Sequence, residues 1–216
     1  MPKELLFNGK RILFIGAHPD DIELGCGALI ANIAPKSEVF CITLSDNQKN
    51  PLLSNLVDEH YASMDILGVD RDHAILKDFT TRRFQHERQE ILEFLFGLNK
   101  QYQPDMVFTH TNADLHQDHS TVTMETLRAF RGVSVFGFDV IRSSSGFFPN
   151  LLVKVDEADA EKKVAALGAY RTYQDKYYFQ EETTKSILIR NGALAESRYA
   201  EGFNIFRVVT AFGSLC

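Results

Sequence analysis

The chain has 216 residues, of which 44% are hydrophobic and 24% are charged, a composition typical of a folded globular protein. Its formal net charge of −6 argues against a general nucleic-acid binder, because binding to phosphates needs a basic face. No apolar run is long enough to span a membrane, and the first ten residues lack the apolar core of a signal peptide, so we expect a cytoplasmic protein.

Short apolar runs typical of β-strands alternate along the chain with longer stretches of helical spacing. The expected strands are residues 11–17, 38–44, 73–77, 105–110, 133–138, 151–155 and 203–210. The expected helices are residues 23–34, 56–68, 84–102, 120–131, 157–170 and 184–200. This succession predicts an α/β fold, in which a Rossmann-like, mostly parallel sheet carries helices on both faces.

No repeat, low-complexity tract or linker interrupts this alternation, so we expect a single domain over residues 1–216. The three cysteines, Cys26, Cys41 and Cys216, show no spacing typical of a metal site, and we expect no disulfide bond. Cys41 falls within an apolar run, which predicts that it is buried in the core.

Two polar loops hold the residues that we expect to carry the chemistry. In doubly wound sheets a ligand binds beyond the carboxyl ends of the strands where the strand order reverses, commonly between the first and the fourth strand. The loops after these two strands are the densest clusters of metal-competent side chains, namely His18, Asp20 and Asp21 in one and Asp114, His116, Asp118 and His119 in the other.

The residue types in these loops indicate a cation. Two imidazoles and one carboxylate form the protein part of a catalytic zinc site. The first loop can supply His18 and Asp21, and the second can supply His119, which we expect in the first turn of a helix capped by Asp118 or Ser120. Crowded carboxylates are costly without a positive partner, so the two loops together predict a metal site.

The other histidines have simpler explanations. His60 and His86 lie among charged residues of expected helices, which predicts that both are solvated. His73 begins an expected strand. His110 ends the fourth strand, and the sequence leaves open whether it reaches the site.

The two loops also resemble a known family. "AHPDDIELGCG" (residues 17–27) and "DLHQDH" (residues 114–119) resemble the signature of the LmbE-like, or PIG-L, N-acetylglucosaminyl deacetylases, and "AEGFNIFRV" (residues 200–208) is similar to the closing strand of that family. The resemblance implies a Rossmann-like zinc hydrolase that acts as an amidase. Such an enzyme removes the N-acetyl group of an amino sugar, with metal-bound water as the nucleophile.

The same resemblance implies a role for each motif residue. His18, Asp21 and His119 would hold Zn²⁺, and Asp20 would act as the general base. His116 would face the tetrahedral intermediate as a cation. Asp118 would orient His116 and keep it charged by raising its pKa.

One departure from the family concerns substrate binding. Many members carry a substrate-contacting arginine on the second helix, whereas residues 54–68 contain none. Arg82 and Arg83, after the third strand, and Arg142, after the fifth, are the expected substitutes for binding an anionic part of the substrate. A surface role for Arg82 and Arg83 is equally consistent with the sequence.

Two other functions remain open at this point. His18, Asp20 and His119 also spell the H-x-D…H triad of non-heme iron enzymes, although that triad is associated with jelly-roll barrels. The chain could also be an inactive metal-binding module of the same fold. We expect a small-molecule amino-sugar substrate, no nucleic acid and no membrane span. The sequence does not identify the sugar, the acyl group or the carrier. It also leaves the oligomeric state open, and a homo-oligomer is possible.

Overall fold

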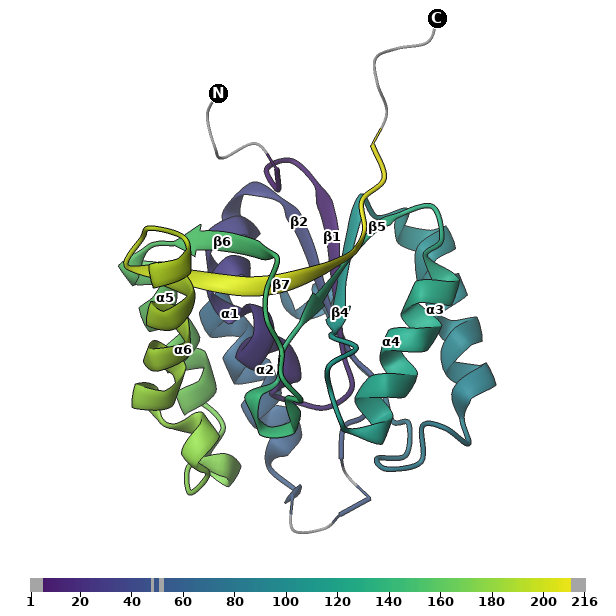
Figure 1. Ribbon diagram of the computed structural model, residues 1–216. Coiled ribbons are helices and arrows are strands. Elements are labelled where there is room, and N and C mark those ends of the chain that lie inside the picture. Colours follow the sequence, from purple (N-terminus) through teal and green to yellow (C-terminus); the bar gives the residue numbers. More distant parts are fainter. Residues whose placement is uncertain (1–5, 48, 51–52, 211–216) are drawn as a thin grey trace, which may run out of the picture.

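The computed structural model describes residues 6–47, 49–50 and 53–210 and contains one seven-stranded sheet there (Figure 1). The strands run in the spatial order β3-β2-β1-β4-β5-β7-β6. Their bounds are β1 Arg11–Gly16, β2 Glu38–Thr43, β3 Ala74–Leu76, β4 Met106–His110, β5 Ser134–Phe138, β6 Leu151–Val155 and β7 Tyr199–Arg207. β1 to β5 pair in parallel, whereas β7 is antiparallel to both β5 and β6.

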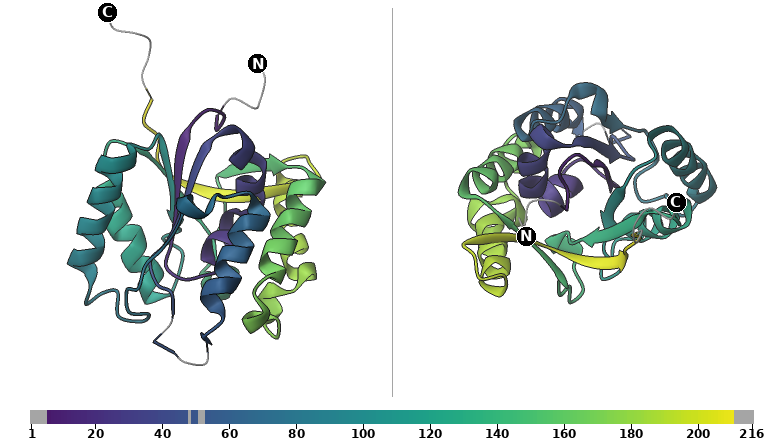
Figure 2. Two further views of the ribbon diagram at one scale, coloured as in Figure 1. Left: turned by 180° about the vertical axis from the view of Figure 1, so that it is seen from behind. Right: turned by 90° about the horizontal axis from the view of Figure 1, so that it is seen from above.

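Helices cover both faces of this sheet, as expected for the mostly parallel α/β fold (Figures 1 and 2). Their bounds are α1 Asp21–Ile33, α2 Leu56–Leu67, α3 Arg88–Tyr102, α4 Gln117–Ala129, α5 Glu157–Gly168 and α6 Glu181–Leu194. α3 and α4 lie on one face, and α1, α2, α5 and α6 lie on the other. No helix within the described residues has the length and the apolar character that crossing a membrane requires.

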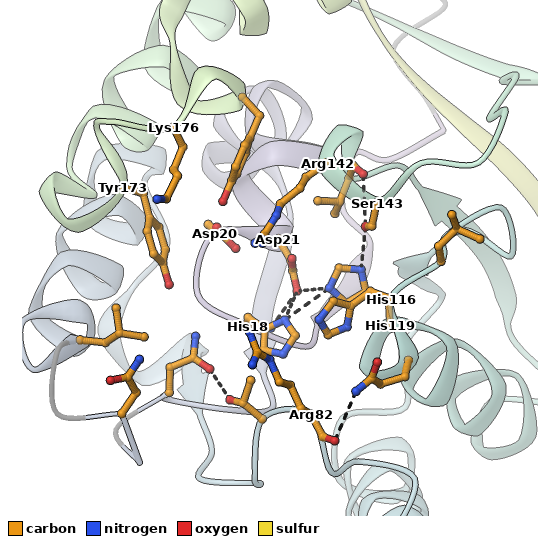
Figure 3. Close-up of a pocket in the computed structure, with 18 of the residues that line it drawn as sticks. His18, Asp20, Asp21, Arg82, His116, His119, Arg142, Ser143, Tyr173 and Lys176 are labelled. Atoms are coloured by element: carbon orange, nitrogen blue, oxygen red, sulfur yellow. Dashed lines mark hydrogen bonds and ion pairs between the residues drawn. The ribbon is translucent and has the colours of Figure 1, made fainter.

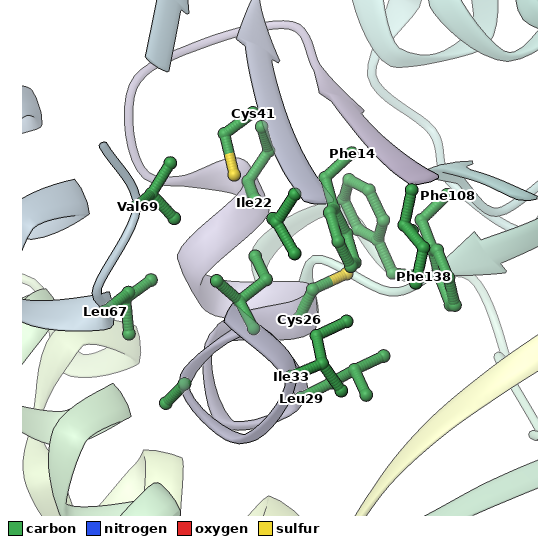
Figure 4. Packing of buried hydrophobic residues seen from close by; sticks show 14 of the residues in the cluster. Phe14, Ile22, Cys26, Leu29, Ile33, Cys41, Leu67, Val69, Phe108 and Phe138 are labelled. Carbon is green, nitrogen blue, oxygen red and sulfur yellow. The ribbon is translucent and has the colours of Figure 1, made fainter. Parts of the chain in front are cut away.

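The central strands are buried on both faces because successive side chains of a strand point to opposite sides. In β1, Ile12 and Phe14 join the core cluster beneath α1, while Leu13 and Ile15 join the cluster beneath α3 and α4. The first cluster also contains the free thiols of Cys26 and Cys41 (Figure 4). Cys216 lies outside the described residues.

The strand order reverses at β1, as the sequence predicts. β1 pairs with β2 on one side and with β4 on the other, so the chain leaves β1 for one face and leaves β4 for the other. The start of α1 can approach this edge closely because residue 25 is a glycine. A Cβ atom at Gly25 would lie 2.3 Å from the ring of Phe138. The loops after β1 and β4 therefore face each other across a crevice.

Several predicted boundaries differ from the structure by a few residues, and two of the differences have a clear physical reason. The helix expected from residue 84 begins at Arg88, because the chain before it turns to place the N–H groups of Arg82 and Phe84 on Asp118. The helix expected over 184–200 is α6, which ends at Leu194, since Tyr199 and Ala200 pair with β6 in the sheet. Local helical spacing is overridden there by strand pairing.

Candidate metal centre and active site

The loop after β1 is shaped by its own carboxylate. The N–H groups of Ala17 and His18 donate to Oδ2 of Asp21 at 3.1 and 2.8 Å. Asp21 begins α1 and is buried. Between His18 and Asp21, Asp20 has a φ of 108°, a conformation that side-chain-bearing residues rarely adopt. Such strain clusters at functional sites, where the surrounding structure holds it in place.

The loop after β4 is shaped by Asp114. One carboxylate oxygen of Asp114 accepts from the N–H of His116 at 2.8 Å, and the other lies 2.8 Å from Nδ1 of His119. His119 lies in the first turn of α4, as expected. The helix cap is His116 rather than the expected Asp118 or Ser120, because the His116 side chain accepts from the Asp118 N–H.

Three side chains from the two loops converge on one point (Figure 3). Oδ2 of Asp21 lies 3.4 Å from Nδ1 of His18 and 3.4 Å from Nε2 of His119, and these two nitrogen atoms are 3.3 Å apart. Zinc–ligand bonds of about 2.0–2.1 Å in a tetrahedron place ligand atoms roughly 3.3–3.4 Å apart. The three donors thus form a triangle of the size that a tetrahedral metal ion needs.

The outer hydrogen bonds of both histidines aim their lone pairs at this point. Nδ1 of His119 faces Asp114, and Nε2 of His18 lies 3.0 Å from Oδ2 of Asp118. With the ring protons assigned to these outer contacts, the inner nitrogen atoms present lone pairs beside the Asp21 carboxylate. Carboxylates that hold the outer N–H of a histidine are typical of metal sites. The residues therefore fit a divalent metal ion.

In the metal-free protein, a proton on His18 can supply the positive charge that a metal ion would otherwise bring. Burial opposes the charged form of His18, but hydrogen bonds to Asp118 and Asp21 outweigh it and raise the pKa of His18 to about 10. The pKa of Asp21 is held well below its usual value, since burial is outweighed by the neighbouring His119 and His110. The site is thus built for positive charge between its donors.

Two further imidazoles lie close enough to be ligands. Among the described residues, a ring nitrogen of His116 lies within 4.8 Å of ligand atoms of His18 and His119. A ring nitrogen of His110 lies within the same distance of ligand atoms of Asp21 and His119. Their hydrogen bonds argue against ligation. Nδ1 of His116 accepts from the Asp118 N–H at 3.1 Å, and Nε2 of His110 accepts from the Ala17 N–H at 3.1 Å. Each imidazole must then carry its proton on the nitrogen that remains.

The contacts of Asp118 and His116 differ from those expected. The carboxylate of Asp118 accepts from the Arg82 N–H at 2.6 Å and contacts His18, while only its backbone reaches the His116 ring. Burial and the nearby His119 and His18 lower the pKa of His116 to about 4. The Asp118 carboxylate therefore does not hold the His116 ring in the way the sequence suggests, and the lowered pKa favours a neutral His116 with Nε2–H as its donor.

Asp20 stands beside this cluster. Its side chain lines the cavity and makes no hydrogen bond or ion pair to the described residues (Figure 3). Only 8% of the residue is exposed. Burial, reinforced by the charge of Asp21, raises the pKa of Asp20 well above its usual value. A carboxyl group in such surroundings suits the acceptance and return of a proton.

The site opens into a cavity of about 860 Å³. Arg82 and Arg142 line this cavity, as the sequence suggests, whereas Arg83 is not among its lining residues. The sequence analysis missed the wall made by Tyr173, Lys176 and Tyr178, between α5 and α6. The dense run of aromatic and basic residues in "YRTYQDKYYF" (residues 170–179) is the signal that could have indicated it.

A buried polar cluster lies behind the site, and it corrects a second expectation. His60 is fully buried rather than solvated, and its Nδ1 lies 3.0 Å from the hydroxyl of Tyr170. That hydroxyl donates to Glu23 of α1 at 2.5 Å. The cluster joins α1 and α2 to the segment that precedes the cavity wall. His86 is exposed, but in a turn before α3 rather than on a helix.

Comparison with known proteins finds a family and relatives that resemble this chain. A family model described as PIG-L: GlcNAc-PI de-N-acetylase matches residues 13–130, a range that contains both loops of the site. The chain is 30% identical over 170 residues to the uncharacterized deacetylase YaiS of Escherichia coli (strain K12). This alignment covers 76% of this chain and 91% of that protein.

Two more distant likenesses extend over most of the chain. The diacetylchitobiose deacetylase of Thermococcus kodakarensis is 24% identical over 222 residues, covering 89% of this chain and 82% of that protein. The crystal structure of GalB, the 4-carboxy-2-hydroxymuconate hydratase of Pseudomonas putida KT2440, superposes with a TM-score of 0.77 and 18% identity, covering 94% of this chain and 100% of that chain. The second likeness concerns the fold alone.

Proposed function

The chain belongs to the PIG-L family, and on this premise we propose that it is a zinc-dependent N-deacetylase. The proposed reaction is hydrolysis of the amide of an N-acetylated amino sugar or of a conjugate of such a sugar, with water as the nucleophile. The proposal is supported by relatives that are named deacetylases, one of them a diacetylchitobiose deacetylase. We propose one deacetylase domain over residues 1–216.

The observation that carries this proposal is the donor triangle of His18, Asp21 and His119 at the bottom of a cavity. We propose these three residues as the zinc ligands. Asp118 and Asp114 would hold the outer nitrogen atoms of the two histidines, a contact that fixes the ring tautomer and orientation. Two nitrogen donors and one oxygen donor leave room for water and substrate.

Zinc bound there would polarise the amide carbonyl and lower the pKa of a water molecule, so that the water could lose a proton and attack the carbonyl carbon at neutral pH. Asp20 is proposed to accept the proton of that water and to return it to the departing amine. This role is supported by its exposure to the cavity, its lack of a hydrogen-bond partner among the described residues and its raised pKa.

His116 is proposed to stabilise the oxyanion that forms from the carbonyl oxygen. The hydrogen bond from the Asp118 N–H to Nδ1 leaves the proton on Nε2, so a neutral His116 can still donate. A donor fixed before the reaction begins is worth about 10²–10³ in rate. Asp118 contributes to the position of His116 through its backbone N–H and to that of His18 through its carboxylate.

The iron alternative has less support. It requires Asp20 as a ligand, and the described clusters of metal-competent side chains include Asp21 but not Asp20. The doubly wound sheet is also unlike the jelly-roll barrels associated with that triad. The inactive-module alternative also has less support. Asp20 is buried, faces the cavity and has no hydrogen-bond partner among the described residues, an arrangement that costs stability and that a module without catalysis would not need.

The test is metal analysis of the purified protein combined with an assay of amine release from N-acetylglucosamine, diacetylchitobiose and N-acetylglucosamine 1-phosphate. We expect about one zinc ion per chain, loss of amine release after chelation and recovery on addition of zinc. Iron accompanied by oxygen uptake would favour the iron enzyme. A bound metal without amine release from any of the three compounds would contradict the proposed deacetylase.

A further inference from the structure

A buried ion pair lies against the helix that begins at the metal site. Nζ of Lys163, in α5, lies 2.6 Å from Oε1 of Glu201, in β7, and the two side chains are only 5% and 2% exposed. Replacing such a pair by apolar side chains of similar volume is often neutral for stability, because both charges lose their hydration in the interior. The free energy of folding therefore gives little reason to keep this pair.

The ion pair makes directional contacts with the backbone of α1. Nζ of Lys163 donates to the carbonyl oxygen of Leu24 at 2.7 Å. The two carboxylate oxygens of Glu201 accept from the N–H groups of Ala28 and Leu29, at 3.0 and 2.7 Å. In a regular α-helix the N–H of Ala28 donates to the carbonyl of Leu24. The ion pair therefore contacts both the donor and the acceptor of one helical hydrogen bond.

The sequence of α1 leaves room for these contacts. A Cβ atom at Gly27 would lie 3.0 Å from Cγ of Lys163, which is closer than an ordinary van der Waals contact. The lysine thus packs on α1 at a residue that has no side chain. Glu201 pairs with Val153 of β6 in the antiparallel part of the sheet. The ion pair therefore ties α1 to both α5 and β7.

The helical turn held in this way carries the proposed base. The N–H of Leu24 donates to the carbonyl oxygen of Asp20 at 2.9 Å, while the carbonyl of Leu24 accepts from Lys163. Leu24 therefore connects the ion pair to Asp20 through its own backbone. Asp20 has a φ of 108°, and a residue keeps such a conformation only where the surrounding structure holds it.

We propose that Lys163 and Glu201 are positioning residues of the reaction, because their ion pair holds the first turn of α1 and thereby keeps Asp20 in its strained conformation, directed into the cavity. The proposal rests on the proposed function, since only that function makes Asp20 the base. Neither Lys163 nor Glu201 is among the residues that line the cavity of the metal site. Both therefore act through Asp20 and not on the substrate.

Paired substitutions separate position from stability. Lys163→Met alone would leave the carboxylate of Glu201 buried without its cation, which is strongly destabilising. The test therefore uses Lys163→Met/Glu201→Leu, which removes both charges and keeps the volume similar. Lys163→Met/Glu201→Gln is the conservative partner, because glutamine keeps one acceptor oxygen for the N–H groups of α1.

Hydrogen exchange tests the proposal without metal and without turnover. In the metal-free protein, the amide proton of Leu24 should exchange about 10-fold faster in Lys163→Met/Glu201→Leu than in the unaltered protein, while the protons of α3 keep their exchange rates. In the zinc-loaded protein, kcat should fall about 10- to 100-fold with unchanged zinc content and KM, because a small displacement of a reacting group is costly. Lys163→Met/Glu201→Gln should recover part of both effects.

The matched control lies at the other end of the same helix. The side chain of Asn32, in the last turn of α1, donates to Asp159 of α5 at 2.7 Å. Asn32→Leu removes a contact between the same two helices and should change neither the exchange of Leu24 nor kcat. Unchanged exchange and kcat in Lys163→Met/Glu201→Leu, or an equal fall of kcat in Asn32→Leu, would overturn the proposal.

Failure of the proposed function would look different. If the exchange of Leu24 rises in Lys163→Met/Glu201→Leu but even the unaltered protein releases no amine, the hold on Asp20 stands and its role as the base of a deacetylase falls. If the unaltered protein releases amine and this variant does so at the same rate, the deacetylase stands and the positioning role falls.

Discussion

The imidazole of His110 stacks on the imidazole of His119, with ring centroids 3.9 Å apart and ring planes 11° apart. His110 ends β4 and is fully buried. Its Nε2 accepts from the Ala17 N–H, and its Nδ1 finds no partner among the described residues. An unpartnered buried donor costs about 1–3 kcal/mol, so this ring is costly to keep for packing alone. The stack fixes the plane of the proposed ligand His119.

The role of His110 can be separated from its bulk. His110→Phe keeps an aromatic ring against His119 but loses the contact with Ala17, whereas His110→Gln keeps an acceptor and loses the stack. We expect His110→Gln to weaken zinc binding by about tenfold, as losses of outer contacts do. His110→Phe should be affected less. Competition with a fluorescent chelator measures the two affinities, and an unchanged affinity in His110→Gln would show that the stack does not position the ligand.

The carboxylate of Asp114 should matter for the metal more than for the fold. Asp114→Asn can offer an N–H to Nδ1 of His119, which would turn the wrong tautomer toward the donor triangle. We expect zinc affinity to fall by about 10- to 100-fold. Asp139→Asn is a matched control, because Asp139 directly follows the neighbouring strand β5, hydrogen-bonds Ser144 and forms no hydrogen bond or ion pair with a histidine ring among the described residues. Equal losses in the two variants would refute a specific role for Asp114.

Zinc binding should release a proton from His18. The pKa of His18 in the metal-free protein is raised to about 10 from its ordinary 6.5, so at pH 7 the folded protein holds a proton that a metal must displace. Calorimetry in buffers of different ionisation enthalpy should count about one proton released per zinc ion, and affinity should rise with pH. Zinc binding that releases no proton would contradict the ligand role of His18.

The same group predicts how the stability of the metal-free protein depends on pH. Its raised pKa means that protonated His18 stabilises the folded state fully below its ordinary pKa of 6.5, and this contribution is lost as pH rises through about 10. The melting temperature without metal should therefore fall between pH 7 and 10 more than it does in His18→Gln. An identical pH dependence in both proteins would argue against this assignment.

Much of the site could be predicted because its loops directly follow strands that can be recognised from short apolar runs in the sequence. The loop from His18 to Asp21 and the helix start at His119 stand directly behind β1 and β4, and the strand alternation places both at one edge of the sheet. The roles of Asp118 and His110 could not be predicted. Asp118 contacts His18, 100 residues away, and His110 contacts Ala17, 93 residues away.

The cavity wall and the buried cluster escaped prediction for the same physical reason. Tyr173 and Lys176 lie in short turns between α5 and α6, and only tertiary packing brings them opposite Arg142. His60 lies among charged residues in the sequence, but it is buried against the hydroxyl of Tyr170, which is 110 residues away. Local pattern alone cannot reveal contacts of this range.

The most direct test of the account compares two adjacent aspartates of identical chemistry. Asp20→Asn should keep its zinc and its fold and lose about 10²–10⁴ in kcat, because the amide cannot accept a proton. Asp21→Asn should lose zinc on dialysis against a weak chelator and recover part of its activity when zinc is added. The measurement is zinc content and kcat of both variants, side by side. If Asp20→Asn loses its zinc while Asp21→Asn retains it, the proposed roles are reversed and the H-x-D iron site becomes the better account.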